Sequence, residues 1–429
     1  MEFRFIFFLI AFSFSQFHSN EWNSITSYLT PKSISVSNDG IYYAATSGGL
    51  LGFDPIAKKY SFFNKHDGLV SLDLSFIVKD SHNQFWLADS YPNGSLQVFD
   101  LEDGVVKIID HLDEVSEISL IEVGEDRAYA TYKGSSIGDV GILEFSLNAR
   151  GMPEYKDYYV NFSSDHINDI RDFAYFGDSL FITTDHGIFS AYHDDNLKYS
   201  NSWINLYSKN DAIKFVPTDS ENFLFTDSLI IRQNGDIVLD LFNLWPYCEL
   251  LDSNGDLVTC PSPSSNDYCT NYIEDGLAKN LGNCGSEILS VDWNDNQFEI
   301  LYDCLFLMID KYGNQLYKLE VPYSEWSNYK VKYTSMDSFK DQVILGLENY
   351  GFLVFDYLSD SYNLYSPNTP HSNKYYAIEF TSYENLVAVS NSGLLVVDNI
   401  YSDNKTYKNL LSYPDFKYYP KNYEQDNFY

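Results

Sequence analysis

Short apolar strands joined by Gly-containing turns recur along the chain at a nearly constant interval. In each copy a small or hydroxylated residue ends one apolar run, a Gly follows a few turn residues later, and a second apolar run often closes in Asp. The clearest copies occupy residues 45–54, 87–100, 183–189, 345–356 and 389–398. Repeats of about 40 to 50 residues built from short strands are typical of a β-propeller, in which each repeat is one four-stranded blade.

The glycine positions set the length of the repeat. Gly49, Gly94, Gly141 and Gly187 are separated by 45, 47 and 46 residues, and Gly351 and Gly393 by 42. Two degenerate copies, residues 223–231 and 299–307, lie between Gly187 and Gly351. The eight copies predict an all-β fold, a β-propeller of seven or eight four-stranded blades. We expect the ring to close by pairing of residues 22–28 with residues 406–411, at the two ends of the repeat region.

The segments outside the repeats predict the domain organisation. Residues 1–19 carry Arg4, an apolar run and a polar exit, which is the pattern of a signal peptide too short to span a bilayer. The propeller is expected to occupy residues 20–412, with an insertion at residues 246–286, and residues 413–429 form a tail rich in Tyr and Asn. We therefore expect an exported protein of the periplasm, the cell surface or the extracellular space, without membrane insertion of the mature chain.

Cysteines are concentrated in the insertion. Four of the five lie there: Cys248, Cys260, Cys269 and Cys284. A long loop is costly to order, so disulfides are expected in an oxidising compartment. Among the three connectivities that four cysteines allow, we favour Cys248 with Cys260 and Cys269 with Cys284. A four-thiolate zinc site is the alternative, although such sites use close Cys pairs. Cys304, outside the insertion, is predicted to be a small buried thiol.

The charge of the chain limits its partners. Its 61 acidic and 27 basic residues give a formal net charge of −34. Nucleic acids are excluded as partners, because phosphate binding depends on clustered Lys and Arg. Passive adhesion to anionic lipid is disfavoured for the same reason.

No motif in the chain predicts catalysis. Residues 134–138 match the G-x-S-x-G nucleophile motif, but strands precede and follow them, whereas the motif requires a strand that turns into a helix. Residues 252–256 resemble the start of a calcium loop, yet the Gly comes two positions early and no Glu stands at position twelve. A hairpin turn is preferred there, with calcium as the weaker alternative. We name no catalytic, cofactor-binding or metal-binding residue.

The repeat resembles known propeller families. The recurring T-x-x-G-L-x-x-[FY]-D phrase is similar to the repeats of two-component-regulator-type propellers. Trp22, Ser27, Tyr28 and residues 41–50 and 59–69 resemble the opening of the N-terminal propeller of PorZ-like proteins. These are surface components associated with type IX secretion in Bacteroidetes-like bacteria. The resemblance implies an exported bacterial protein whose propeller binds rather than catalyses.

Two functions are consistent with these observations. The first is a non-catalytic interaction module that binds an envelope protein or a surface glycan, as a monomer or as a subunit of a larger assembly. Its contact surfaces would be the loops between the second and third strands of the full copies, together with the disulfide-rich insertion. The second is an extracellular carbohydrate-active or metal-dependent enzyme, which would need acidic or His side chains of several blades to converge at one mouth of the central channel.

Overall fold

The computed structural model describes most of residues 25–411 as strands and short connections. Its description omits residues 91, 93, 111, 113, 137, 219–220, 227–228, 241–248, 252–256, 260–267, 275–276, 285–287, 295, 322–331, 382–383, 392 and 401–404. The predicted signal peptide and tail lie outside the described residues. No helix in the described part of the chain has the length and apolar character needed to cross a bilayer.

Seven four-stranded antiparallel sheets form consecutive blades. Blade 1 contains β1 (Ser33–Val36), β2 (Tyr42–Thr46), β3 (Gly49–Asp54) and β4 (Lys59–Phe63). Blade 2 contains β5 (Leu74–Lys79), β6 (Phe85–Asp89), β7 (Leu96–Asp100) and β8 (Gly104–Ile109). Blade 3 contains β9 (Val115–Val123), β10 (Arg127–Gly134), β11 (Val140–Leu147) and β12 (Pro153–Tyr159). Blade 4 contains β13 (Ile170–Phe176), β14 (Ser179–Thr184), β15 (Gly187–Tyr192) and β16 (Ile204–Tyr207).

The insertion separates blade 5 from the last two blades. Blade 5 contains β17 (Ala212–Val216), β18 (Phe223–Thr226), β19 (Leu229–Arg232) and β20 (Ile237–Asp240). Blade 6 contains β25 (Ile288–Asn294), β26 (Gln297–Tyr302), β27 (Leu305–Asp310) and β28 (Gln315–Glu320). Blade 7 contains β29 (Tyr333–Phe339), β30 (Gln342–Leu347), β31 (Gly351–Asp356) and β32 (Ser361–Tyr365). Two 3-10 helices, η1 (Lys65–Asp67) and η2 (Ser200–Ser202), lie in connections.

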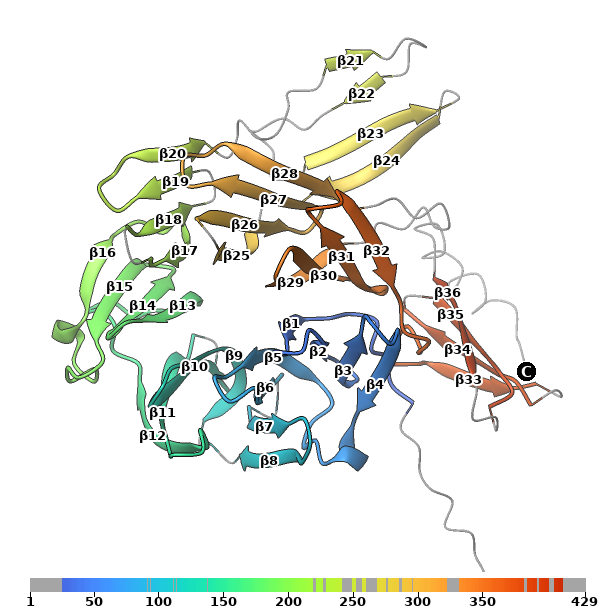
Figure 1. Cartoon of the computed structure of the whole chain (residues 1–429), viewed down its shortest axis with the longest axis horizontal. Coiled ribbons are helices and arrows are strands. Elements are labelled where there is room, and N and C mark those ends of the chain that lie inside the picture. Colours follow the sequence, from blue (N-terminus) through green and yellow to red (C-terminus); the bar gives the residue numbers. More distant parts are fainter. Residues whose placement is uncertain are drawn as a thin grey trace, which may run out of the picture.

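Two further four-stranded sheets lie beside the ring (Figure 1). The insertion sheet contains β21 (Glu249–Leu251), β22 (Leu257–Thr259), β23 (Tyr268–Glu274) and β24 (Leu277–Cys284). The outer sheet contains β33 (Ala377–Phe380), β34 (Leu386–Ser390), β35 (Gly393–Asp398) and β36 (Thr406–Leu411). The prediction of four-stranded blades is confirmed. The ring holds seven of them, because the eighth copy forms the outer sheet.

The first strand of each blade is its innermost strand. In order around the ring these strands are β1, β5, β9, β13, β17, β25 and β29, each in contact with the next, and β29 in turn lies against β1 (Figure 1). Apolar side chains fill the spaces between neighbouring blades rather than a single central core. Each blade therefore depends on both of its neighbours for burial, as expected of a propeller.

The recurring Thr/Ser-x-x-Gly phrase forms a tight turn between the second and third strands. In blade 1, Thr46 Oγ1 donates to the Gly49 carbonyl at 2.7 Å and accepts from Gly48 N at 3.1 Å. Gly49 has φ +124°, and a Cβ there would come within 2.2 Å of the Phe63 carbonyl oxygen. Thr184 and Gly187 repeat this turn in blade 4, again with a positive φ at the glycine. The hydroxyl and the glycine are thus required by the turn itself.

Blade 1 and blade 7 close the ring by burying apolar side chains between them. The cluster contains Tyr28, Ile34, Val36, Tyr42, Ala44, Leu51 and Phe53 with Ile344, Phe352 and Val354 of blade 7. Polar bonds align the two blades: Gly351 N donates to the Leu29 carbonyl at 2.7 Å, and Val36 N donates to Asp337 Oδ2 at 2.8 Å.

The predicted closure by residues 22–28 and 406–411 is wrong where the structure describes it. Residues 25–28 form no strand, and β36 pairs with β35 inside the outer sheet. Instead, Ser27 N donates to Asn373 Oδ1 at 2.6 Å and Tyr28 N donates to Thr369 Oγ1 at 3.3 Å, in the segment that links blade 7 to the outer sheet. The physical reason is that blade 7 already supplies the apolar surface that blade 1 needs.

We predict that Phe53→Ala destabilises the protein by about 3 to 5 kcal/mol, because it leaves a cavity in the closure cluster. Phe53 is 1% exposed and its ring packs near Phe352 and Tyr365. Leu358→Ala, at a side chain 79% exposed after β31, is the control and is expected to change stability by about 0.5 kcal/mol or less. Urea unfolding measures both variants. Equal losses would show that closure does not depend on this interface.

Candidate functional site

Charged side chains from five blades converge at the centre of the ring. This central cluster contains Glu122 on β9, Asp172 on β13, Lys214 on β17, Asp292 on β25 and Asp337 on β29. Lys214 Nζ lies 3.2 Å from Asp172 Oδ1, and it also interacts electrostatically with Asp292 and Glu122. Three of the carboxyl groups thus interact with one ammonium group, and the fourth, Asp337, interacts with Asp292.

Burial shifts the protonation of this cluster. It raises the pKa of Glu122 to about 8, although Lys214 opposes the shift. Burial, followed by the nearby Asp292, raises the pKa of Asp337 to about 7. The pKa values of Asp172 and Asp292 are also raised by burial, against the effect of Lys214. Part of the cluster therefore holds protons near neutral pH, which limits the negative charge at the centre.

Two of the carboxylates connect neighbouring blades. Asp172 Oδ2 accepts a hydrogen bond from Phe215 N of blade 5 at 3.4 Å. Asp337 Oδ2 accepts from Val36 N of blade 1, and its Oδ1 accepts from Ser338 N at 2.8 Å. Because the inner edge of an innermost strand has no partner strand, these side chains satisfy backbone donors that would otherwise lack one.

Serine side chains also form hydrogen bonds between neighbouring innermost strands, here in blades 1 to 3. Ser33 Oγ donates to the Ile77 carbonyl at 3.2 Å, and Ser75 Oγ donates to the Ile118 carbonyl at 2.5 Å. A polar side chain on an innermost strand is thus a recurring device for joining blades. Asp172 and Asp337 belong to this structural set.

The cluster does not form a metal site. No group of three or more His, Cys, Asp or Glu in the described part of the chain is arranged to hold a metal ion. The calcium-like residues 252–256 lie outside the described residues.

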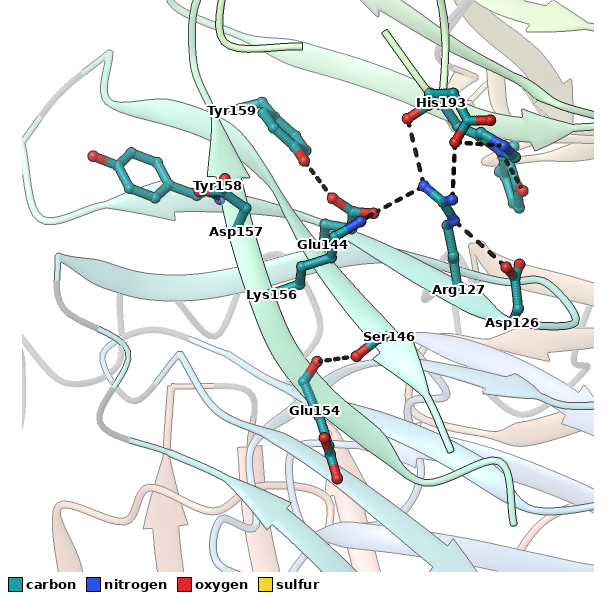
Figure 2. A network of polar contacts seen from close by, with 12 residues as sticks. Asp126, Arg127, Glu144, Ser146, Glu154, Lys156, Asp157, Tyr158, Tyr159 and His193 are labelled. Carbon is teal, nitrogen blue, oxygen red and sulfur yellow. Dashed lines mark hydrogen bonds and ion pairs between the residues drawn. The ribbon is translucent and has the colours of Figure 1, made fainter. Parts of the chain in front are cut away.

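A second polar network joins blades 3 and 4 (Figure 2). Glu144 on β11, 1% exposed, accepts from Lys156 Nζ at 2.7 Å, from Arg127 Nη1 at 3.4 Å and from the hydroxyl of Tyr159. Arg127 reaches across to blade 4, where its Nη2 lies 3.0 Å from Asp194 Oδ1. The buried carboxylate is paired with two cations, and the network fastens the β15–β16 connection to blade 3.

A polar hollow of about 320 Å³ lies between blades 1 and 7. It is lined by Tyr42, Pro55, Ile56, Gln342, Val354, Asp356, Ser359, Ser361, Asn363 and Tyr365. Several of its polar groups bond to one another: the Tyr42 hydroxyl donates to Gln342 Oε1 at 3.1 Å, and Gln342 Nε2 donates to Asp356 Oδ2 at 3.2 Å. These bonds contribute to ring closure.

Cys304 corrects the cysteine predictions. It lies in the turn between β26 and β27 and is disulfide-bonded, so the prediction of a free thiol is wrong. The other four cysteines lie outside the described side chains. The predicted pairs, Cys248 with Cys260 and Cys269 with Cys284, therefore stay predictions.

The G-x-S-x-G motif lies between two strands, as predicted. Gly134 ends β10, and the next described element is the strand β11, which begins at Val140. The central cluster, in contrast, was not predicted. The sequence did carry one signal for it, because Asp172 and Asp337 stand 15 and 14 residues before the turn glycines Gly187 and Gly351, each inside the first strand of its blade.

Comparison with solved structures identifies the fold. A structure of PorZ, described as an essential bacterial surface component of the type IX secretion system of Porphyromonas gingivalis, matches with a TM-score of 0.58 and 12% identity. The match covers 90% of this chain and 46% of that chain. The chain has a β-propeller fold. The predicted resemblance to PorZ-like propellers is confirmed for the fold, and the chain spans less than half of the PorZ structure.

Other structures are more distant. The extracellular domain of a hybrid two-component system from B. thetaiotaomicron matches with a TM-score of 0.37 and 14% identity, over 93% of this chain and 60% of that chain. BamB from Moraxella catarrhalis matches with a TM-score of 0.43 and 10% identity, over 76% of this chain and 95% of that chain. No protein-family model and no curated protein sequence matches the chain.

We predict that Arg127→Met destabilises the protein by about 3 kcal/mol, because it removes one cation from the buried Glu144 and the link to Asp194. Arg150→Met, at an exposed position in the β11–β12 connection, is the matched control and is expected to have little effect. Urea unfolding of both variants measures the difference. Equal stability of the two would mean that the network does not hold blade 3 to blade 4.

We predict that Glu122 makes stability depend on pH. The folded state raises the pKa of Glu122 to about 8, whereas the pKa of a Glu in the unfolded chain is about 4.3. Between these two pH values the folded protein keeps a proton that the unfolded chain has released. The contribution of Glu122 to stability therefore falls as pH rises from about 4 to about 8. Glu122→Gln should raise Tm clearly when Tm is measured above pH 8, and should raise it less when Tm is measured at about pH 5.

Glu125→Gln, at an exposed side chain just after β9, is the control for this experiment. Its effect on Tm should be similar at both pH values. A gain for Glu122→Gln that is the same at both pH values would contradict a raised pKa.

Proposed function

We propose that the protein is an exported, non-catalytic interaction module that binds another protein of the cell envelope. The observation that carries this proposal is that two of the four central carboxylates, Asp172 and Asp337, join neighbouring blades of the ring. Asp172 pairs with Lys214 and accepts from Phe215 N, and Asp337 accepts from Val36 N. Groups that hold blades together in this way are poorly suited to bind a substrate and move during a reaction.

Export is supported by two independent features. Residues 1–19 have the pattern of a signal peptide. Cys304 is disulfide-bonded, and structural disulfides are typical of oxidising compartments outside the cytosol. The match with PorZ, itself described as a bacterial surface component, is consistent with this location, and a link to type IX secretion is part of the proposal.

The binding surface is proposed to be the face that carries the turns between second and third strands. Residues 185 and 186 in blade 4 and residues 348–350 in blade 7 are partly exposed there. The insertion connects blades 5 and 6 on the same face, and we propose that it extends this surface. Rigid blades with variable connections on one face suit protein recognition.

The enzyme alternative rests on Glu122 and Asp292. Neither side chain forms a hydrogen bond within the described part of the chain. Glu122, whose pKa is raised to about 8, can donate a proton at neutral pH. A carbohydrate-active enzyme that uses these two groups is therefore the second candidate.

One experiment distinguishes the two functions. Wild-type protein and the Glu122→Gln/Asp292→Asn variant are immobilised and exposed to envelope extract, and the captured proteins are identified by mass spectrometry and competed with untagged protein. We expect both forms to capture the same protein, and a His186→Ala/Glu348→Lys variant to capture less. Loss of a glycan-cleaving activity in the Glu122→Gln/Asp292→Asn variant, without any specific capture by the wild type, would overturn the proposal.

A further inference from the structure

The outer sheet has the construction of a blade but no blade beside it in the ring. Its turn repeats that of blade 1: Ser390 Oγ donates to the Gly393 carbonyl at 3.2 Å, as Thr46 does to Gly49. Its register also matches. Ile378 lies opposite Ala388 in the outer sheet, as Ile34 lies opposite Ala44 in blade 1.

Equivalent positions differ sharply in exposure. Ile34 and Val36 on β1 are 5% and 3% exposed, because blade 7 covers them. Their counterparts on β33, Ile378 and Phe380, are 56% and 57% exposed. Tyr376, just before the strand, is 59% exposed. The sequence thus provides the apolar face of an innermost strand at a place where nothing in the described part of the chain covers it.

β33 is also an unprotected sheet edge. It pairs with β34 on one side, stands first in the strand order of the outer sheet, and is exposed at all four positions. Natural edge strands are usually shielded by charge, Pro or a bulge. Among residues 377–380 only Glu379 is charged, and the pairing with β34 is regular.

The local charge permits contact between two copies. Residues 371–410 contain three Lys (374, 405 and 408) against four acidic residues (379, 384, 398 and 403), a net charge of −1. The remainder of the chain carries the other −33 of the total of −34. Two copies would repel each other across most of their surfaces, but not across the outer sheet.

We propose that β33 pairs with β33 of a second copy, antiparallel about a two-fold axis at Ile378, and merges the two outer sheets into one of eight strands. In this register Ile378 faces its own symmetry mate, and Tyr376 faces Phe380 of the other copy. Glu379 faces Ala377, so no like charges meet. The strand is therefore self-complementary, as a two-fold interface requires. This inference is independent of the proposed binding function.

The interface is short, so we expect association in the micromolar range. Salt should strengthen it, because screening reduces the repulsion between the acidic rings. Sedimentation velocity of the full chain, from about 1 to 100 μM and at low and moderate salt, measures both effects. We expect Ile378→Lys/Phe380→Lys to weaken the dimer at least about tenfold, by placing charges in the interface.

Ile56→Lys is the matched control, because Ile56 is 89% exposed at a turn of blade 1. Its dimerisation should equal that of the wild type. Circular dichroism and Tm verify that both variants are folded. A wild-type chain that remains monomeric at all concentrations, or a dimer that survives Ile378→Lys/Phe380→Lys, would overturn the proposal. A β33 that pairs only with a strand of a different protein would also overturn the proposal.

Cysteine cross-linking tests the register independently of affinity. Directly opposed residues in an antiparallel pair have Cα atoms about 4.5 to 5.5 Å apart, within reach of a disulfide. Ile378→Cys should therefore form a covalent dimer on mild oxidation. Glu379→Cys should form much less, since its symmetry mate is displaced along the strand. Equal cross-linking of the two would contradict a two-fold axis at Ile378. A negative cross-linking result would contradict the dimer but not the proposed binding function, which the capture experiment on envelope extract tests.

Discussion

The ring depends on apolar burial between blade 7 and blade 1. Each blade covers one face of the blade before it and is covered by the next, so an open row of blades would leave two apolar faces in water. Ile344 and Phe352 meet Ile34 and Phe53 at the closing interface, and none of the described strands is shared between the two blades. Every other feature of the molecule, from the central cluster to the position of the outer sheet, follows from this closure.

Closure also explains why charged groups are tolerated at the centre. Innermost strands have one edge without a partner strand, and their backbone groups need hydrogen bonds. Asp172, Asp337 and Ser33 supply them from neighbouring blades. The cost of burying the carboxylates appears as raised pKa values and is offset in part by Lys214. Acidic residues of this chain therefore have a structural role inside the ring, in addition to those that lie on its solvated surface.

Local sequence patterns were sufficient for the blades but not for their assembly. The hydroxyl and glycine of each turn are set by hydrogen bonding and positive φ, so Thr46 and Gly49 reveal the repeat directly. The outer sheet carries the same local pattern as a ring blade, and only the fit of blade 7 on blade 1 excludes it from the ring. The insertion sheet was missed because its strands do not follow the repeat.

A distance across the closing interface tests this account most directly. Ile56 lines the hollow between blades 1 and 7 together with Ser359, and both Ile56 and Leu358 are well exposed. Spin labels introduced at positions 56 and 358 through unnatural amino acids avoid the native cysteines, and pulsed electron paramagnetic resonance measures their separation. A closed seven-blade ring predicts a single short distance with a narrow distribution. A long or broad distribution would contradict closure between these two blades.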